Sequence, residues 1–316
     1  MNMHADSQQS IRAAADGDGV VLTVPQPFSY IETLHYLKRS NEEVLHRVTE
    51  DGRILKLLRV RDRPLLMEVS NDESRGELRI RSLSGGREPE RLLEAAAYVW
   101  EWFGLDADLN AFYRMASGDP VLGPLVARHD GLRIIGVPDL FEALCWSIIG
   151  QQITLSFAYQ LKKRFVQTYG EAVDYEGERY WTFPDPAAIA RLTPDDLRPL
   201  QFSRSKSAFL VGVAREAESG ALDRTSTALR SGFDAAVARL TSLHGIGPWS
   251  ANYALMRCLR YPEAFPIQDA GIHQAVRKLL GLEAKPSLAE LRALYAPWAG
   301  WEAFATFYLW RSLSDQ

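Results

Sequence analysis

The sequence contains only two cysteines in 316 residues, Cys145 and Cys258, and both lie in apolar helical patterns far apart in the chain. Two thiols cannot supply the four cysteine ligands of a typical iron–sulfur cluster, so the sequence excludes that cofactor. Nor do they form the framework of a disulfide-rich secreted domain, and we expect two reduced thiols in the core. We therefore expect an intracellular, cytoplasmic protein that requires no cofactor.

Long apolar runs are also absent, and none reaches the length that spans a membrane. Residues 1–18 are polar and lack the apolar segment of a signal peptide, so we interpret them as a disordered tail. We expect no membrane partner. A net charge of −4 argues against a protein that coats nucleic acid indiscriminately. With 47% hydrophobic residues, the chain can form one large or two modest globular domains.

Carboxylates are missing from residues 235–262, a stretch that contains Arg239, Arg257, Arg260 and His244. A small basic face on an acidic protein favours a short, positioned contact with DNA phosphates. Ordinary solvated helix residues would give the same pattern, so that alternative stays open.

The chain divides into two parts by its apolar periodicity. Residues 19–86 predict a small α+β domain, and Ser84-Gly85-Gly86 mark its end. From Arg91 onward the pattern is helical, so we expect an all-helical domain over residues 87–316. The expected strands are Val20–Val24, Val44–Thr49, Ile54–Val60, Leu65–Val69 and Glu77–Leu83, with a helix over Phe28–Arg39.

A turn rich in glycine joins two helical patterns, Phe233–Leu243 and Trp249–Leu259. Gly245 and Gly247 permit backbone angles that other residues avoid, and Pro248 suits the first position of a helix. The sequence thus predicts a helical hairpin whose backbone N–H groups can bind an anion such as a DNA phosphate.

Asp269 follows Pro266 by three residues and precedes a helical run, Ala270–Leu280. This position is typical of a helix N-cap, which would explain the aspartate by itself. A second role is compatible with the first, because the helix dipole keeps a carboxylate ionised, as a group facing a developing cation must be.

This order of hairpin, tryptophan, Asn-Tyr and spaced aspartate resembles the HhH-GPD DNA glycosylases, and Gly-Pro-Trp-Ser-Ala-Asn-Tyr is similar to the DNA-3-methyladenine glycosylase II family. The resemblance implies an α+β fold, in which a small N-terminal sheet domain precedes an all-helical, two-lobed HhH-GPD domain with a DNA-facing cleft. It also implies a monomer that binds double-stranded DNA containing damaged bases. The expected reaction is excision of alkylated bases, such as 3-methyladenine, in base excision repair.

Excision breaks an N-glycosidic bond through an oxocarbenium-like sugar, after the base has left the stack. The resemblance assigns Asp269 as the catalytic carboxylate that stabilises this cation. Gly150-Gln151-Gln152 matches the family's wedge loop, and Gln152 falls on the wedge position, where the best-known member has an apolar residue. A polar residue between two helices is the alternative interpretation of Gln152.

A flipped cationic base is best received by aromatic faces. Trp249, Tyr253 and Trp298 match aromatic positions of the family's pocket, and Phe141 and Trp146 are further candidates. Trp249 and Tyr253 are four residues apart and share one helix face. Core packing is the alternative for each of these residues. It is our expectation for three other tryptophans, Trp100, Trp102 and Trp310.

The resemblance also assigns the hairpin. The residues expected to bind a DNA phosphate are His244, Gly245, Ile246, Gly247 and Pro248. Backbone carbonyls can hold a monovalent cation, Na⁺ or K⁺, there, and the candidates are those of Thr241, Leu243 and Gly245. One departure lies near the C-terminus, where Ala299 replaces the arginine of the family's Pro-Trp-Arg-Ser segment.

Lysine is absent between Lys206 and Lys278, and Trp249 occupies the place where bifunctional relatives carry a Schiff-base lysine. We therefore expect a monofunctional glycosylase that uses water and lacks lyase activity. Two rival functions stay open: a glycosylase for a neutral deaminated or mismatched base, and a helix-hairpin-helix module that binds DNA without chemistry.

Overall fold

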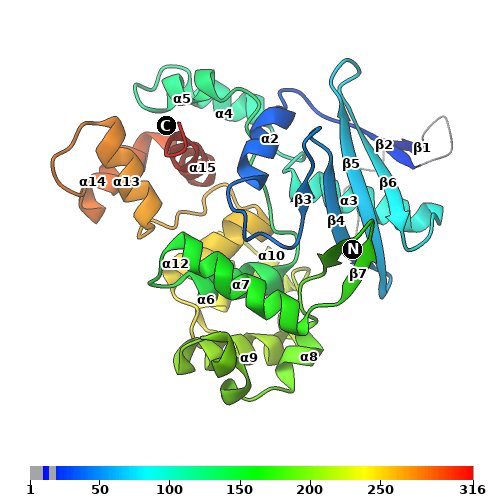
Figure 1. The fold of residues 1–316 in the computed structure, drawn as a ribbon. Coiled ribbons are helices and arrows are strands. Elements are labelled where there is room, and N and C mark those ends of the chain that lie inside the picture. The colour runs from blue at the N-terminus through cyan, green and yellow to red at the C-terminus, as the bar shows by residue number, and fades with distance from the viewer. Residues whose placement is uncertain (1–9, 14–18, 316) are drawn as a thin grey trace.

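The computed structural model describes residues 10–13 and 19–315 of the chain. An antiparallel sheet of six strands, in the order β1-β2-β6-β5-β4-β3, lies on one side of the molecule, at the right in Figure 1. The strands are β1 (Ile11–Ala13), β2 (Val20–Thr23), β3 (Arg47–Val48), β4 (Ile54–Val60), β5 (Arg63–Asp72) and β6 (Glu77–Ser84).

The central strands are apolar on both faces because both faces are covered. On one face, Ile54 and Leu65 join the main core beneath α3 (Pro89–Trp102). On the other, Leu55 and Leu66 pack with Tyr180, which comes from a separate hairpin. A strand covered twice carries a near-continuous apolar run, which explains ILKLLRV in β4.

The helices form two lobes that meet beside the sheet (Figure 1). The first lobe contains α6 (Leu140–Gly150), α7 (Leu155–Tyr169), α8 (Pro186–Ala190), η1 (Pro194–Leu200), α9 (Arg204–Glu218), α10 (Thr227–Arg230), α11 (Phe233–Thr241), α12 (Pro248–Ala254) and the π-helical turn η2 (Leu255–Leu259). The second contains α4 (Leu109–Ala116), α5 (Leu122–Arg128), α13 (Ala270–Leu279), α14 (Leu288–Tyr295), η3 (Ala296–Trp298) and α15 (Glu302–Ser312). One continuous core of buried side chains connects the sheet with both lobes.

The α+β class is confirmed, and so are four of the expected strands, in β2, β4, β5 and β6. The expected helix Phe28–Arg39 is α2 (Tyr30–Leu37), which begins at the N-cap Ser29. The expected strand Val44–Thr49 shrinks to β3.

Two expectations about secondary structure were wrong. Ile11–Ala13 pairs with β2, so the predicted disordered tail contains a strand; its other residues, except Ser10, lie outside the described part. The C-terminal part is not all helical either, since β7 (Ala172–Tyr175) and β8 (Glu178–Trp181) form a hairpin. Glu176 and Gly177 both have positive φ, 51° and 80°, as a tight two-residue turn requires.

Cys145 and Cys258 are buried and unpaired, as expected for reduced core thiols. Burial raises the pKa of Cys258 to about 12, which keeps this thiol protonated at neutral pH. Within residues 10–13 and 19–315, no helix combines the length and apolar character needed to cross a membrane.

Candidate active site

The hairpin between α11 and α12 depends on Gly245. Its φ is +88°, and a Cβ at this position would lie 2.2 Å from Cγ of Phe209. Ile246 is buried and anchors the turn in the core, whereas nothing lies within 4 Å of a Cβ placed on Gly247. Gly245 is therefore required for packing, and Gly247 and Pro248 stay exposed at the start of α12.

The loop between α6 and α7 is fixed against this hairpin. The side-chain amide of Gln151 donates to the carbonyl oxygen of Gly245 over 3.0 Å and to Oγ of Ser250 over 3.2 Å. On its other side, Nζ of Lys206 donates to the carbonyl oxygen of Ile149 over 2.7 Å. The next residue, Gln152, is exposed and has a left-handed backbone with φ of 56°.

Asp269 is the N-cap of α13, and its carboxylate accepts four hydrogen bonds. Oδ1 accepts from the backbone N–H of Gly271 over 2.8 Å and of Ile272 over 3.2 Å. Oδ1 also accepts from the indole N–H of Trp310 over 2.8 Å, and Oδ2 accepts from that of Trp249 over 3.1 Å. Donors on both oxygens fix the position and the plane of the carboxylate.

An aromatic wall continues from these two indoles. The Trp249 and Tyr253 rings stack with centroids 5.7 Å apart and planes 27° apart, as their spacing on one helix face predicts. Tyr253 also lies 6.4 Å from Trp310, and Trp310 lies 6.2 Å from Phe307. Tyr36 of α2 extends the wall, with its ring 5.1 Å from Phe307.

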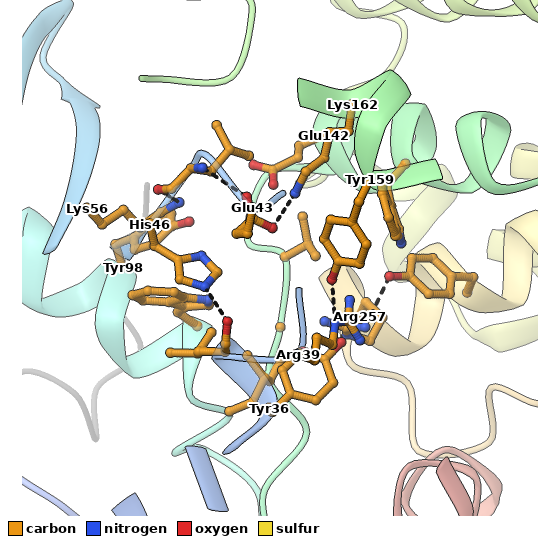
Figure 2. A pocket seen from close by; sticks show the side chains of 18 residues that line it. Tyr36, Arg39, Glu43, His46, Lys56, Tyr98, Glu142, Tyr159, Lys162 and Arg257 are labelled. Carbon is orange, nitrogen blue, oxygen red and sulfur yellow. Dashed lines mark hydrogen bonds and ion pairs between the residues drawn. The ribbon is translucent and has the colours of Figure 1, made fainter. Parts of the chain in front are cut away.

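Tyr253 also lines a cavity of about 50 Å³. Figure 2 shows this cavity, whose labelled side chains include Tyr36 and Arg39 of the N-terminal domain. Its near end is lined by Tyr36, Arg39, Tyr253 and Arg257. Arg257 is buried, donating from Nε to the carbonyl oxygen of Ile135 over 2.6 Å and from Nη1 to the Tyr253 hydroxyl over 3.0 Å. Burial raises the pKa of Tyr253, so its hydroxyl stays protonated.

The far end of the cavity is a cluster of buried charges. Nζ of Lys162 lies 2.5 Å from Oε2 of Glu43. Burial would raise the pKa of Glu43, but the Lys162 ammonium outweighs that effect and holds it well below its usual range. Burial lowers the pKa of His46 to about 4, so this imidazole is neutral at physiological pH. Lys56 and Glu142 complete the lining there.

Two of the predicted pocket residues lie elsewhere. Trp298 is fully buried, and its indole N–H donates to Oδ2 of Asp119 over 2.7 Å. Phe141 is buried edge-on against Phe183, with ring centroids 5.7 Å apart. Both are core residues and neither lines the cavity beside Tyr253, so their assignment to the base pocket stays a prediction. Trp146 lines the cavity, with Nζ of Lys162 at 5.2 Å from the centre of its ring.

The tryptophan that the sequence analysis placed in the core, Trp310, binds Asp269 instead. No local spacing links the two residues, since they lie 41 positions apart. Packing of α15 on α13 brings them together. Gly271 permits the close approach, because a Cβ there would lie 3.0 Å from Cδ1 of Trp310.

The predicted basic face is also absent. Arg239 pairs with Glu216 over 2.9 Å, Arg260 pairs with Asp106 over 2.8 Å, and Arg257 is buried. Carboxylates from distant parts of the chain pair with Arg239 and Arg260. The absence of carboxylates within residues 235–262 therefore does not produce a positively charged surface. His244 is exposed and packs edge-on against Phe209 with ring centroids 4.9 Å apart.

Comparison with known proteins decides the family. Residues 145–299 match the HhH-GPD superfamily base excision DNA repair proteins, and residues 20–139 match the AlkA N-terminal domain. The chain belongs to the HhH-GPD superfamily. The match to the AlkA N-terminal domain includes α3, α4 and α5, which the sequence analysis had assigned to the helical domain.

Similar relatives cover both domains of this HhH-GPD protein. It is 42% identical to "DNA-3-methyladenine glycosylase" of Bacillus subtilis over 94% of this chain and 97% of that one. It is 30% identical to "DNA-3-methyladenine glycosylase 2" of Escherichia coli, over 72% and 75% of the two chains. The fold matches the 3-methyladenine DNA glycosylase of Archaeoglobus fulgidus, with a TM-score of 0.78 at 23% identity over 94% of this chain and 99% of that one.

We predict that the two hairpin glycines differ in their effect on stability. Gly245→Ala places a Cβ inside the Phe209 ring at a positive φ and should lower the free energy of unfolding by about 2–4 kcal/mol. Gly247→Ala meets open space and should cost less than about 1 kcal/mol. Urea denaturation without DNA measures both, and equal losses would contradict the packing argument.

We also predict that two Trp→Phe substitutions separate activity from stability. Trp310→Phe removes a donor to the Asp269 carboxylate and should slow base release by about 10-fold. Trp298→Phe removes the buried partner of Asp119 and should cost about 1–3 kcal/mol of stability while the folded enzyme keeps its rate. Single-turnover base release and thermal unfolding of each variant provide the check. If Trp298→Phe slowed base release more than Trp310→Phe did, Trp298 and not Trp310 would be the tryptophan that acts in the site.

Proposed function

We propose that this chain removes alkylated bases of the 3-methyladenine type from double-stranded DNA and that Asp269 performs the catalytic step. The observation that carries the proposal is the carboxylate itself. It is half-buried, it is held by two indole N–H groups, and it lies beside a wall of aromatic rings. A carboxylate so fixed can face a developing sugar cation without reorganising.

The proposed reaction begins when the damaged base leaves the helical stack and rests on the aromatic wall formed by Tyr253 and Trp310. An alkylated purine is already cationic, and aromatic faces attract it by stacking and by cation–π interaction. As the bond from C1′ to the base breaks, the base leaves as a neutral molecule. Asp269 then stabilises the positive sugar while water adds to C1′ and gives up one proton to the surrounding water.

We further propose that water is the only nucleophile and that the enzyme lacks lyase activity. The position where bifunctional glycosylases carry a lysine is Trp249, whose indole is bound to Asp269. The preceding lysine, Lys206, donates to the carbonyl oxygen of Ile149, and the next, Lys278, lies in the last turn of α13. None of these groups supports formation of a Schiff base at the site.

The hairpin and the wedge loop complete the proposed contact with DNA. Gly247 and Pro248 are exposed where α12 begins, which suits a backbone phosphate near free N–H groups. Gln152 is the proposed wedge, since it is exposed on a loop held by Gln151.

A monovalent cation at the hairpin remains part of this proposal. The carbonyl oxygens of Leu243 and Gly245 accept one hydrogen bond each, from Ile246 and Gln151, and each keeps a second lone pair. With Thr241 they are the residues that would hold Na⁺ or K⁺, which would add positive charge near the phosphate.

We predict that Asp269→Asn lowers the rate of base release by about 10²- to 10³-fold, because the neutral amide cannot stabilise the sugar cation. Asparagine is also a good N-cap, so α13 should keep most of its stability. Single-turnover release from a duplex carrying 3-methyladenine measures the rate, and DNA binding is the control. Equal, measurable release by both proteins would refute the role of Asp269, and no release by either while DNA binding is retained would indicate a binding module without chemistry.

The absence of lyase activity gives a separate prediction. Wild-type enzyme should leave the strand intact until alkali cleaves the abasic site, and borohydride should trap no covalent enzyme–DNA complex. Denaturing gels with and without alkali measure the first result, and a bifunctional 8-oxoguanine glycosylase serves as the positive control for trapping. A trapped complex would refute the argument from Trp249.

A further inference from the structure

Two guanidinium groups meet beside Tyr36 in the cavity, one from Arg39 just after α2 and one from Arg257 in η2 (Figure 2). Their central carbons lie 4.1 Å and 5.1 Å from the centre of the Tyr36 ring. Across residues 10–13 and 19–315, neither arginine forms an ion pair with a carboxylate. The base site therefore borders on an uncompensated positive charge.

Arg39 has hydrogen-bond donors to spare. Its Nε donates to the Tyr159 hydroxyl, and its two terminal nitrogens have no partner among the described residues. Arg39 is an exposed residue that also lines the cavity, so its guanidinium faces that space. The hydroxyl of Tyr36 beside it is buried and also lacks a partner within the described chain. Unpaired donors in such a place are costly unless water or a ligand satisfies them.

These groups add a way to bind a base with an oxo group, beside the aromatic wall that receives a cationic purine. A guanidinium donates to carbonyl oxygens and repels a positive charge. A neutral base such as hypoxanthine also differs from 3-methyladenine in how it leaves. The bond from N9 to C1′ breaks with its electron pair on the base, so a neutral base departs as an anion, whereas an alkylated cation departs neutral.

We propose that Arg39 determines specificity by donating hydrogen bonds to an oxo oxygen on the edge of the flipped base and stabilising a neutral base as it departs. The electron pair of the broken bond is delocalised from N9 onto the oxygen that Arg39 faces. A water oxygen bonds to C1′, and the proton that this water loses ends on the released base. The inference rests on the proposed function, because it requires the base to lie on Tyr253 and Trp310.

The pocket then combines two modes of binding. The aromatic wall attracts cationic alkylated purines, and Arg39 extends the range to neutral bases that carry an oxo group. Arg257 contributes charge from a fixed position, since it is buried and bound to Ile135 and Tyr253. Arg39 has fewer bonds to the protein and more donors free, so its removal should affect the substrate more than the fold.

The test compares two bases in otherwise identical duplexes, hypoxanthine and 3-methyladenine, under single-turnover conditions. Arg39→Gln removes the charge and should lower hypoxanthine release by about 10- to 100-fold, as for a charged hydrogen bond. It should change 3-methyladenine release by less than about 3-fold, because a cation leaving as a neutral base gains little from Arg39. Lys38→Gln is the matched control: Lys38 is the exposed neighbour, carries the same charge and does not line the cavity.

The outcomes separate the two proposals. Equal loss for both bases, or no loss for either, would overturn the role of Arg39, and thermal unfolding of each variant reveals a loss that comes from folding. Wild-type release of 3-methyladenine without any release of hypoxanthine would also overturn it, while the proposed function would stand. Wild-type release of neither base would refute the proposed function itself. An equal effect of Lys38→Gln would show that overall charge, and not the position of Arg39, is responsible.

Discussion

The site depends on one carboxylate shared by two indoles. Trp249 comes from α12 in the first lobe and Trp310 from α15 in the second, and both donate to Asp269. The same carboxylate caps α13. The geometry of the candidate site, the arrangement of the lobes and the capping of α13 are thus combined in four hydrogen bonds. A shift of α12 or of α15 would move an indole N–H away from the carboxylate oxygen that it binds. We therefore expect the site to tolerate only small movements of these two helices.

Gly245 and Gln151 hold together the two loops that we propose contact DNA. A residue larger than glycine at position 245 would clash with Phe209. The carbonyl oxygen of Gly245 accepts a hydrogen bond from the side-chain amide of Gln151. This hydrogen bond joins the hairpin to the loop between α6 and α7, although Gln151 and Gly245 lie 94 positions apart in the chain.

The sequence predicts those parts of the site that are encoded locally. Two helices joined by a glycine turn, an aspartate at an N-cap, and a Trp–Tyr pair on one helix face each follow from spacing within a few residues. Trp298 and Trp310 could not be told apart in this way, since only the packing of α15 on α13 decides which indole meets Asp269. Arg39 was missed for the same reason, as it approaches the cavity from a different domain. The sheet was predictable from its apolar runs, but the β7–β8 hairpin was hidden within a region of helical pattern.

The indole bridge across the two lobes has a consequence for how damage is found. Because Asp269 links α12 to α13 and α15, any closure of one lobe on the other would break hydrogen bonds at the site. The duplex must then supply the bending and unstacking that bring a base to the site, and the energy of that distortion depends on the DNA rather than on the protein. Bases whose stacking is already weakened by damage need the least free energy to leave the duplex. A stiff enzyme therefore selects its substrates partly by the mechanics of the double helix, before any contact with the base is made.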